Sequence, residues 1–115
     1  MKYLCLVYME EKTLAEIPDS ECMAFSEPLR KSGQIVAAEA LQSVHTATTV
    51  RVRNGKTSMT DGPFAETKEQ LAGFYLIDAR NLDEAIQVAS KIPPARVGSI
   101  EVRPVRQLAG STRST

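Results

Sequence analysis

The densest group of chemically active side chains lies in residues 60–78, TDGPFAETKEQLAGFYLID. Asp61 opens a turn with Gly62 and Pro63, a combination that favours a tight, stiff reversal. Glu66 and Lys68 follow in a polar run that leads into an apolar segment. A carboxylate whose position is fixed by a rigid turn can act as a general base or bind a polar group of a ligand. A nearby lysine can neutralise its charge. Charged loop residues anchored by a rigid strand are a common way to build a site.

Two interpretations of Asp61 are open. It can bond its own backbone as a turn residue, or it can be a functional carboxylate that works with Glu39, at the end of another predicted strand. The second interpretation predicts that Asp61 is partly buried and within reach of Lys68, Glu39 or a turn amide. Glu66 and Lys68 are in turn either solvated residues or ligand-binding residues beside these two acids.

Three further side chains are candidates for ligand binding. His45 is the single histidine, and imidazole titrates near neutral pH, but it falls in an irregular connection. Tyr8 and Tyr75 lie on predicted strands, where each is either a core residue or directs its hydroxyl into a cavity.

Several classes of function have no support in the sequence. No phosphate-binding loop or cofactor fingerprint is present, and the single histidine and the absence of a CxxC pair give no visible metal site, so no cofactor or metal is predicted. A formal net charge of zero argues against a nucleic-acid partner. No apolar run approaches the roughly 20 residues of a membrane helix, and the apolar N-terminal run is too short for a signal peptide. We therefore expect a cytoplasmic protein in which Cys5 and Cys22 form no disulfide.

The elements that must position these residues follow from periodicity and turn chemistry. Strands are predicted at 3–9, 34–40, 71–78 and 97–105, helices at 19–32 and 81–92, and a hairpin at 48–52 and 57–59. The order is βαββαβ with the hairpin inserted, an α+β, ferredoxin-like chain. Both helices would cover one sheet face, so the bare face predicts a homodimer formed sheet to sheet.

Local details of the two helices can be predicted as well. Asp19 should cap the first helix, Gly33 should end it, and Pro28 should kink or split it. Asn81 should cap the second, with Glu84 completing a box-like start. The predicted buried faces are Cys22, Phe25 and Leu29 in the first helix and Leu82, Ala85, Ile86 and Ala89 in the second.

The dipeptide Asn54-Gly55 predicts a two-residue type I′ hairpin turn. Such a turn fixes the register: Arg53 opposes Lys56, Val52 opposes Thr57, Arg51 opposes Ser58, and Val50 opposes Met59. One hairpin face is then Val50, Val52, Thr57 and Met59, predicted to be half-buried, and Asp61 comes just after the second strand.

The runs DGPFAETKEQLAGFYLIDA, ALQSVHTATTVRVRNGK and GSIEVRPV resemble the DGPF family, a branch of the YCII-related proteins. The resemblance covers most of residues 1–108 as one domain, and 109–115 is predicted to be a disordered tail. It implies a ferredoxin-like chain that dimerises into an α+β barrel. Some YCII relatives have a histidine–aspartate pair proposed as catalytic, with the histidine on the first helix. Residues 19–32 contain no histidine, so this pair does not transfer.

Two functions remain open at this stage. The first is a dimeric α+β barrel with a small polar pocket between sheet and hairpin, lined by Glu39, Asp61, Glu66 and Lys68, that binds an unknown small molecule. Its chemistry would be metal-free acid/base catalysis of the lyase or isomerase kind. The second is a non-enzymatic regulatory or interaction module, since relatives often accompany extracytoplasmic-function sigma factors. Acids that converge on a closed pocket favour the enzyme, and acids that fan out into solvent favour the module.

Overall fold

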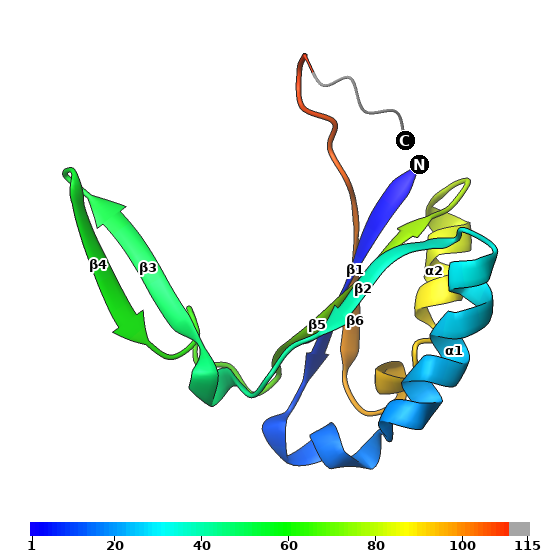
Figure 1. The fold of residues 1–115 in the computed structure, drawn as a ribbon, viewed down its shortest axis with the longest axis horizontal. Helices are drawn as coiled ribbons and strands as arrows, with labels where there is room; N and C mark the ends of the chain where they lie inside the picture. The colour runs from blue at the N-terminus through cyan, green and yellow to red at the C-terminus, as the bar shows by residue number, and fades with distance from the viewer. Residues whose placement is uncertain (111–115) are drawn as a thin grey trace.

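A computed structural model describes residues 1–110, and its elements follow the predicted order (Figure 1). The main sheet contains β1 (Lys2–Met9), β2 (Ile35–Ala40), β5 (Gln70–Asp78) and β6 (Ser99–Pro104). The helices are α1 (Asp19–Lys31) and α2 (Leu82–Ala89), with the short 3₁₀ helices η1 (Glu11–Glu16), η2 (Val44–Thr46) and η3 (Pro93–Arg96). The hairpin is β3 (Thr48–Arg53) and β4 (Lys56–Asp61). Of the predicted tail, 111–115 lie outside the described residues.

The main sheet is antiparallel in the order β2-β5-β1-β6, which confirms the ferredoxin-like βαββαβ topology with an inserted hairpin. Directly paired residues share a face. Cys5 pairs with Tyr75 and Val102, so these three side chains lie on the face that the helices cover. Figure 1 shows α1 and α2 on one side of the sheet and the hairpin on the other.

The core lies between the sheet and the two helices. Along β1, alternate residues Tyr3, Cys5, Val7 and Met9 are buried, which is the period-two pattern of a strand covered on one face. Cys22, Phe25 and Leu29 of α1 pack against this core, as their helical spacing predicts. The opposite sheet face carries Leu4 and Leu6, which pair with Leu76 and Phe74, and no helix of residues 1–110 covers it.

Two details of α1 differ from the prediction. The N-cap is Pro18, whose side chain makes no capping bond, and Asp19 is already the first helical residue. Pro28 neither splits nor ends the helix, which runs on to Lys31. Gly33 has a φ of +83°, the left-handed geometry that follows many helix ends.

In α2 the predicted cap is confirmed but the buried face is not. The Asn81 side chain accepts a hydrogen bond from the Glu84 amide, whereas the Glu84 carboxylate reaches the amide of Arg80 rather than that of Asn81. The helix ends at Ala89, and its buried residues are Ala85, Val88 and Ala89. Leu82 and Ile86 are about half exposed, because α2 is short and contacts the sheet through its small side chains.

The hairpin has the predicted turn and the predicted register. Asn54 and Gly55 have φ of 52° and 74°, and all four predicted pairs are present. Its burial was predicted wrongly. Val50 and Val52 are each 58% exposed and Met59 is 73% exposed, because the hairpin extends away from the sheet as an arm (Figure 1). We call residues 48–61 the arm; Asp61 is the last residue of β4, not the residue after it.

At Gly73 of β5 the backbone of β2 approaches closely. A Cβ atom at Gly73 would lie 2.8 Å from the Glu39 carbonyl oxygen. Close pairing of β2 with β5 therefore requires glycine there. No helix of the described residues is long and apolar enough to span a bilayer.

Candidate functional site

A cavity of about 500 Å³ lies between α1, η1 and the strands β1, β2 and β5. Its wall is mostly apolar and includes Val7, Leu14, Ile17, Ala38 and Ala72. Its polar lining side chains come mainly from α1: Asp19, Cys22, Ser26 and Arg30, facing Tyr75 of β5. Glu39 of β2 also borders the cavity, but it pairs with Phe74, so its side chain lies on the opposite face of the sheet. This size, and an apolar wall with a few polar groups, are typical of a small-molecule site.

Tyr75 and Cys22 form the inner polar part of the cavity. Burial, together with the neighbouring Cys22 thiol, raises the pKa of Tyr75 to about 12. Burial likewise raises the pKa of the Cys22 thiol, with Glu21 adding to that effect. The Tyr75 ring packs edge-on against Phe25 with a centroid distance of 5.7 Å, which fixes its orientation. At neutral pH the pair therefore presents a neutral hydroxyl and a neutral thiol.

Arg30 and Asp19 carry charge at the open side of the cavity. Both are exposed, and neither makes a side-chain hydrogen bond or ion pair within residues 1–110. The Arg30 guanidinium is close enough to Tyr75 to lower its pKa in part. A guanidinium that no carboxylate of the described chain neutralises is a suitable partner for an anionic ligand group.

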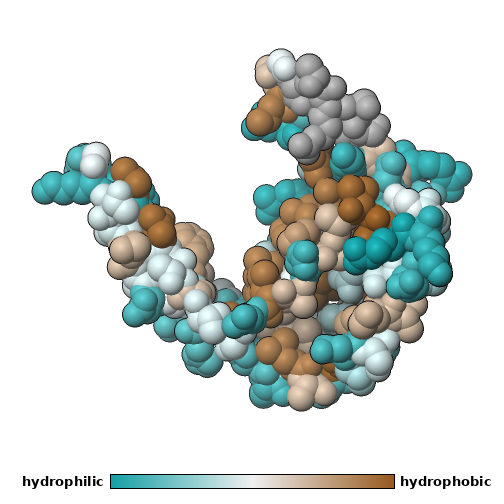
Figure 2. Space-filling view, viewed as in Figure 1, coloured by the Kyte–Doolittle hydropathy of each residue, from teal (hydrophilic) through white to brown (hydrophobic). Residues whose placement is uncertain are grey.

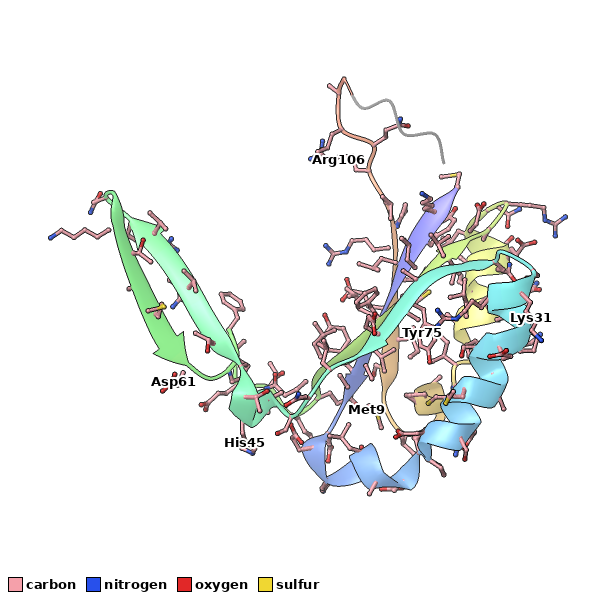
Figure 3. The ribbon with its side chains drawn as sticks, viewed as in Figure 1. Met9, Lys31, His45, Asp61, Tyr75 and Arg106 are labelled. Atoms are coloured by element: carbon pink, nitrogen blue, oxygen red, sulfur yellow. The ribbon has the colours of Figure 1, made fainter. Side chains whose placement is uncertain are left out.

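Among the predicted site residues, Tyr75 directs its side chain to the cavity. Glu39 borders the cavity too, but its pairing with Phe74 puts its carboxylate on the helix-free face, and its catalytic role stays a prediction. Asp61 lies elsewhere, at the base of the arm, and is exposed (Figure 3). The expected contact of Asp61 with Lys68 or Glu39 is absent from the described chain, because Asp61 ends a strand that projects from the body. Within residues 1–110 the structure thus does not bring Asp61 together with Glu39 and Lys68, whereas the catalytic role of Asp61 stays a prediction.

Glu66 and Lys68 are also exposed, on the loop between β4 and β5. Lys68 pairs with Glu10 at 3.4 Å, and this pair, with Lys12 on the same carboxylate, holds the pKa of Glu10 below its ordinary value. The neighbouring Glu69 accepts a hydrogen bond of 2.7 Å from Ser99. These contacts tie the loop to the body, so Lys68 has a structural partner in place of the predicted acids.

The remaining two candidates are apart from the cavity as well. His45 is exposed in η2, and Figure 3 shows it near the base of the arm, far from Tyr75. Tyr8 pairs with Ser99 on the sheet face that has no helices and is half-buried there. Within residues 1–110 no group of three or more His, Cys, Asp or Glu side chains is arranged to hold a metal ion.

Sequence reasoning missed the α1 side of the site. Cys22, Ser26 and Arg30 recur every four residues, and Asp19 precedes them by three, so all four share one stripe of the helix. That stripe runs beside the apolar stripe of Phe25 and Leu29 that packs on the sheet. In the sequence, a polar stripe beside the buried stripe of the same helix was the signal that could have located this part of the site.

The comparisons with known proteins agree with this fold. The model of the YCII-related domain matches residues 1–109. An uncharacterised protein, R00369 of Rhizobium meliloti (strain 1021), is 47% identical over 77 residues, and the match spans 65% of this chain and 62% of that protein. A solved structure with a similar fold is 5-chloro-2-hydroxyhydroquinone dehydrochlorinase (TftG) of Burkholderia phenoliruptrix AC1100, in complex with 2,5-dihydroxybenzoquinone. Its TM-score is 0.57 at 16% identity, covering 92% of this chain and 94% of that one.

Proposed function

The chain belongs to the YCII-related family, and from this premise we propose that it is a homodimeric protein that binds a small organic anion in the α1 cavity. The observation that carries the proposal is the cavity itself, about 500 Å³ with an apolar wall and, at its open side, Arg30, whose side chain has no hydrogen-bond or ion-pair partner within residues 1–110. The apolar wall suits a ring or a short carbon skeleton, and Arg30 suits a carboxylate or an acidic hydroxyl group. The structural neighbour, by its name, was solved with a quinone, which is a ligand of this size class.

The chemistry that we propose is proton transfer by protein side chains, of the lyase or isomerase kind. Asp19 supplies a carboxylate that can accept a proton, while Tyr75 supplies a hydroxyl that stays protonated at neutral pH and can donate a hydrogen bond. Such a division between a carboxylate base and a neutral hydroxyl donor is what acid/base catalysis requires.

We propose the homodimer because the sheet face opposite the helices is apolar at its centre. Leu4 and Leu76 pair directly, as do Leu6 and Phe74, so four apolar side chains are contiguous there. A second copy of the sheet would remove this surface from water, at about 25 cal/mol for each Å² of apolar area.

A thermal-shift screen of small aromatic carboxylates tests the ligand class, with uncharged analogues of the same shape beside them. We expect the carboxylates to stabilise the protein more than the analogues. Arg30→Gln should weaken carboxylate binding about fivefold, the effect of a partly exposed charge contact of about 1 kcal/mol. The matched control is Lys31→Gln, which removes the neighbouring positive charge outside the cavity lining. Equal loss in both variants, or equal binding of charged and uncharged compounds, would contradict the proposal.

A second candidate function is the interaction module. The observation that favours it is the exposure of Asp61 and Glu66, which fan out into solvent instead of converging on a pocket. In that case no compound of the screen would stabilise the protein, and Asp61→Asn would leave its melting temperature unchanged.

A further inference from the structure

The arm has no partner within the described chain. β3 and β4 pair with each other and with no strand of the main sheet. A two-stranded hairpin alone is at best marginally stable in water, so a surface that packs against it would stabilise it. Val50, Val52 and Met59 form one face of the arm, which we call the apolar arm face, and all three are more than half exposed.

The dimensions of the chain also indicate a missing partner. It exposes 8101 Å², whereas a compact monomer of 12.6 kDa is expected to expose about 6,200 Å². Its radius of gyration is 15.9 Å, against roughly 13 Å for a compact chain of 115 residues. The excess area exceeds the roughly 800 Å² that each partner buries in a standard interface. Figure 2 shows apolar side chains both on the arm and along the body, separated by open space.

Charge favours a second copy of this chain as the partner. The arm carries Arg51, Arg53 and Lys56 against the single acid Asp61, a formal charge of +2. Because the whole chain has a formal charge of zero, the remainder carries −2. Arm and body are therefore complementary in sign, and two-fold symmetry would form the same arm-to-body contact twice.

We propose that the arm of each copy packs its apolar arm face against the body of a second copy and so stabilises the dimer. This inference rests on the proposed homodimer, since it assigns the arm to that assembly. It explains why valines and a methionine occupy exposed positions on a projecting hairpin. It also assigns to the arm a structural role in assembly, separate from the α1 cavity.

The direct test is an isotope-filtered NMR experiment on a mixture of methyl-labelled and unlabelled full-length chains. We expect intermolecular contacts between the methyl groups of Val50, Val52 and Met59 and protons of the unlabelled copy. A dimer whose intermolecular contacts come only from Leu4, Leu6 and their neighbours would contradict the proposed arm-to-body contact. It would still agree with the proposed homodimer. A monomer in sedimentation at micromolar concentration would overturn both.

A variant series measures the strength of the contact. The triple variant Val50→Thr, Val52→Thr, Met59→Thr keeps residues suited to strands and removes the apolar arm face. We expect its dimer dissociation constant to rise at least tenfold, while the exposed-helix control Leu82→Gln, Ile86→Gln changes it less than twofold. An unchanged constant in the triple variant would show that the arm does not hold the dimer.

Discussion

At the scale of single residues, two glycines are required by close backbone contacts. A Cβ atom at Gly98 would lie 2.1 Å from the Tyr8 carbonyl oxygen, and one at Gly73 would lie 2.8 Å from that of Glu39. Neither position can accept alanine unless a strand moves. We therefore expect both substitutions to lower the free energy of unfolding, by about 1–3 kcal/mol for Gly73→Ala and by more for Gly98→Ala.

Urea unfolding of the two alanine variants beside the unmodified chain measures this effect. The order of the two variants is the informative result, because the contact at Gly98 is closer. Equal stability of all three proteins would mean that β1, β2 and the segment before β6 do not approach as closely as the structure describes.

Residue-level sequence reasoning succeeded where local chemistry decides the outcome. Asn54-Gly55 adopts positive φ and fixes the register, because few other residues tolerate that geometry. Tyr75 lines the cavity and Asp61 does not. The position of Asp61 depends on the direction of the hairpin relative to the sheet, and no local rule determines that direction. The sequence therefore predicts the turn and not the surroundings of Asp61.

At the scale of elements, a carboxylate in η1 holds the connection that leads to the arm. Glu11 accepts hydrogen bonds of 2.8 Å from the Val44 amide and 3.0 Å from the Ser43 hydroxyl. These bonds hold the pKa of Glu11 below its ordinary value of 4.5. A carboxyl with a lowered folded-state pKa stabilises the fold above the unfolded value, and this contribution is lost as the pH falls through the folded value.

Glu11→Gln should accordingly lower the melting temperature at pH 7, and the difference from the unmodified chain should shrink as the pH falls below about 4.5. Hydrogen exchange at the Val44 amide should become faster in the variant. Glu16→Gln, at the exposed end of η1, is the matched control and should change neither quantity. A difference in melting temperature that stays constant between pH 7 and pH 3 would show that the charge of Glu11 does not stabilise the position of η2.

The order and type of the strands and α-helices were predictable, because turns and apolar periods mark them, whereas the 3₁₀ helices η1, η2 and η3 were not predicted. Which side of a helix is buried was predictable for α1 and not for α2. In α1 three apolar residues at helical spacing define a single face that can be buried, and they pack on the core. In α2 the apolar residues are spread more widely, and the small Ala85 and Ala89 are buried with Val88 while the larger Leu82 is exposed.

At the scale of the whole molecule, the cavity and the arm lie on opposite sides of the sheet (Figure 1). The helix side holds the cavity, and the bare side holds the surfaces that we assign to a second copy. Sequence reasoning predicted the bare face from the count of helices and strands. It could not predict that the arm would project away from its own sheet, because no local pattern of residues sets the direction of a hairpin relative to the sheet.

The most direct test of the account is to map where a small aromatic carboxylate binds, by following backbone amide shifts during a titration. We predict that the largest shifts occur at Cys22, Ser26, Ala38 and Tyr75, which line the cavity. Shifts centred on Asp61, Glu66 and Lys68, with the cavity residues unchanged, would contradict the account and place the site at the base of the arm.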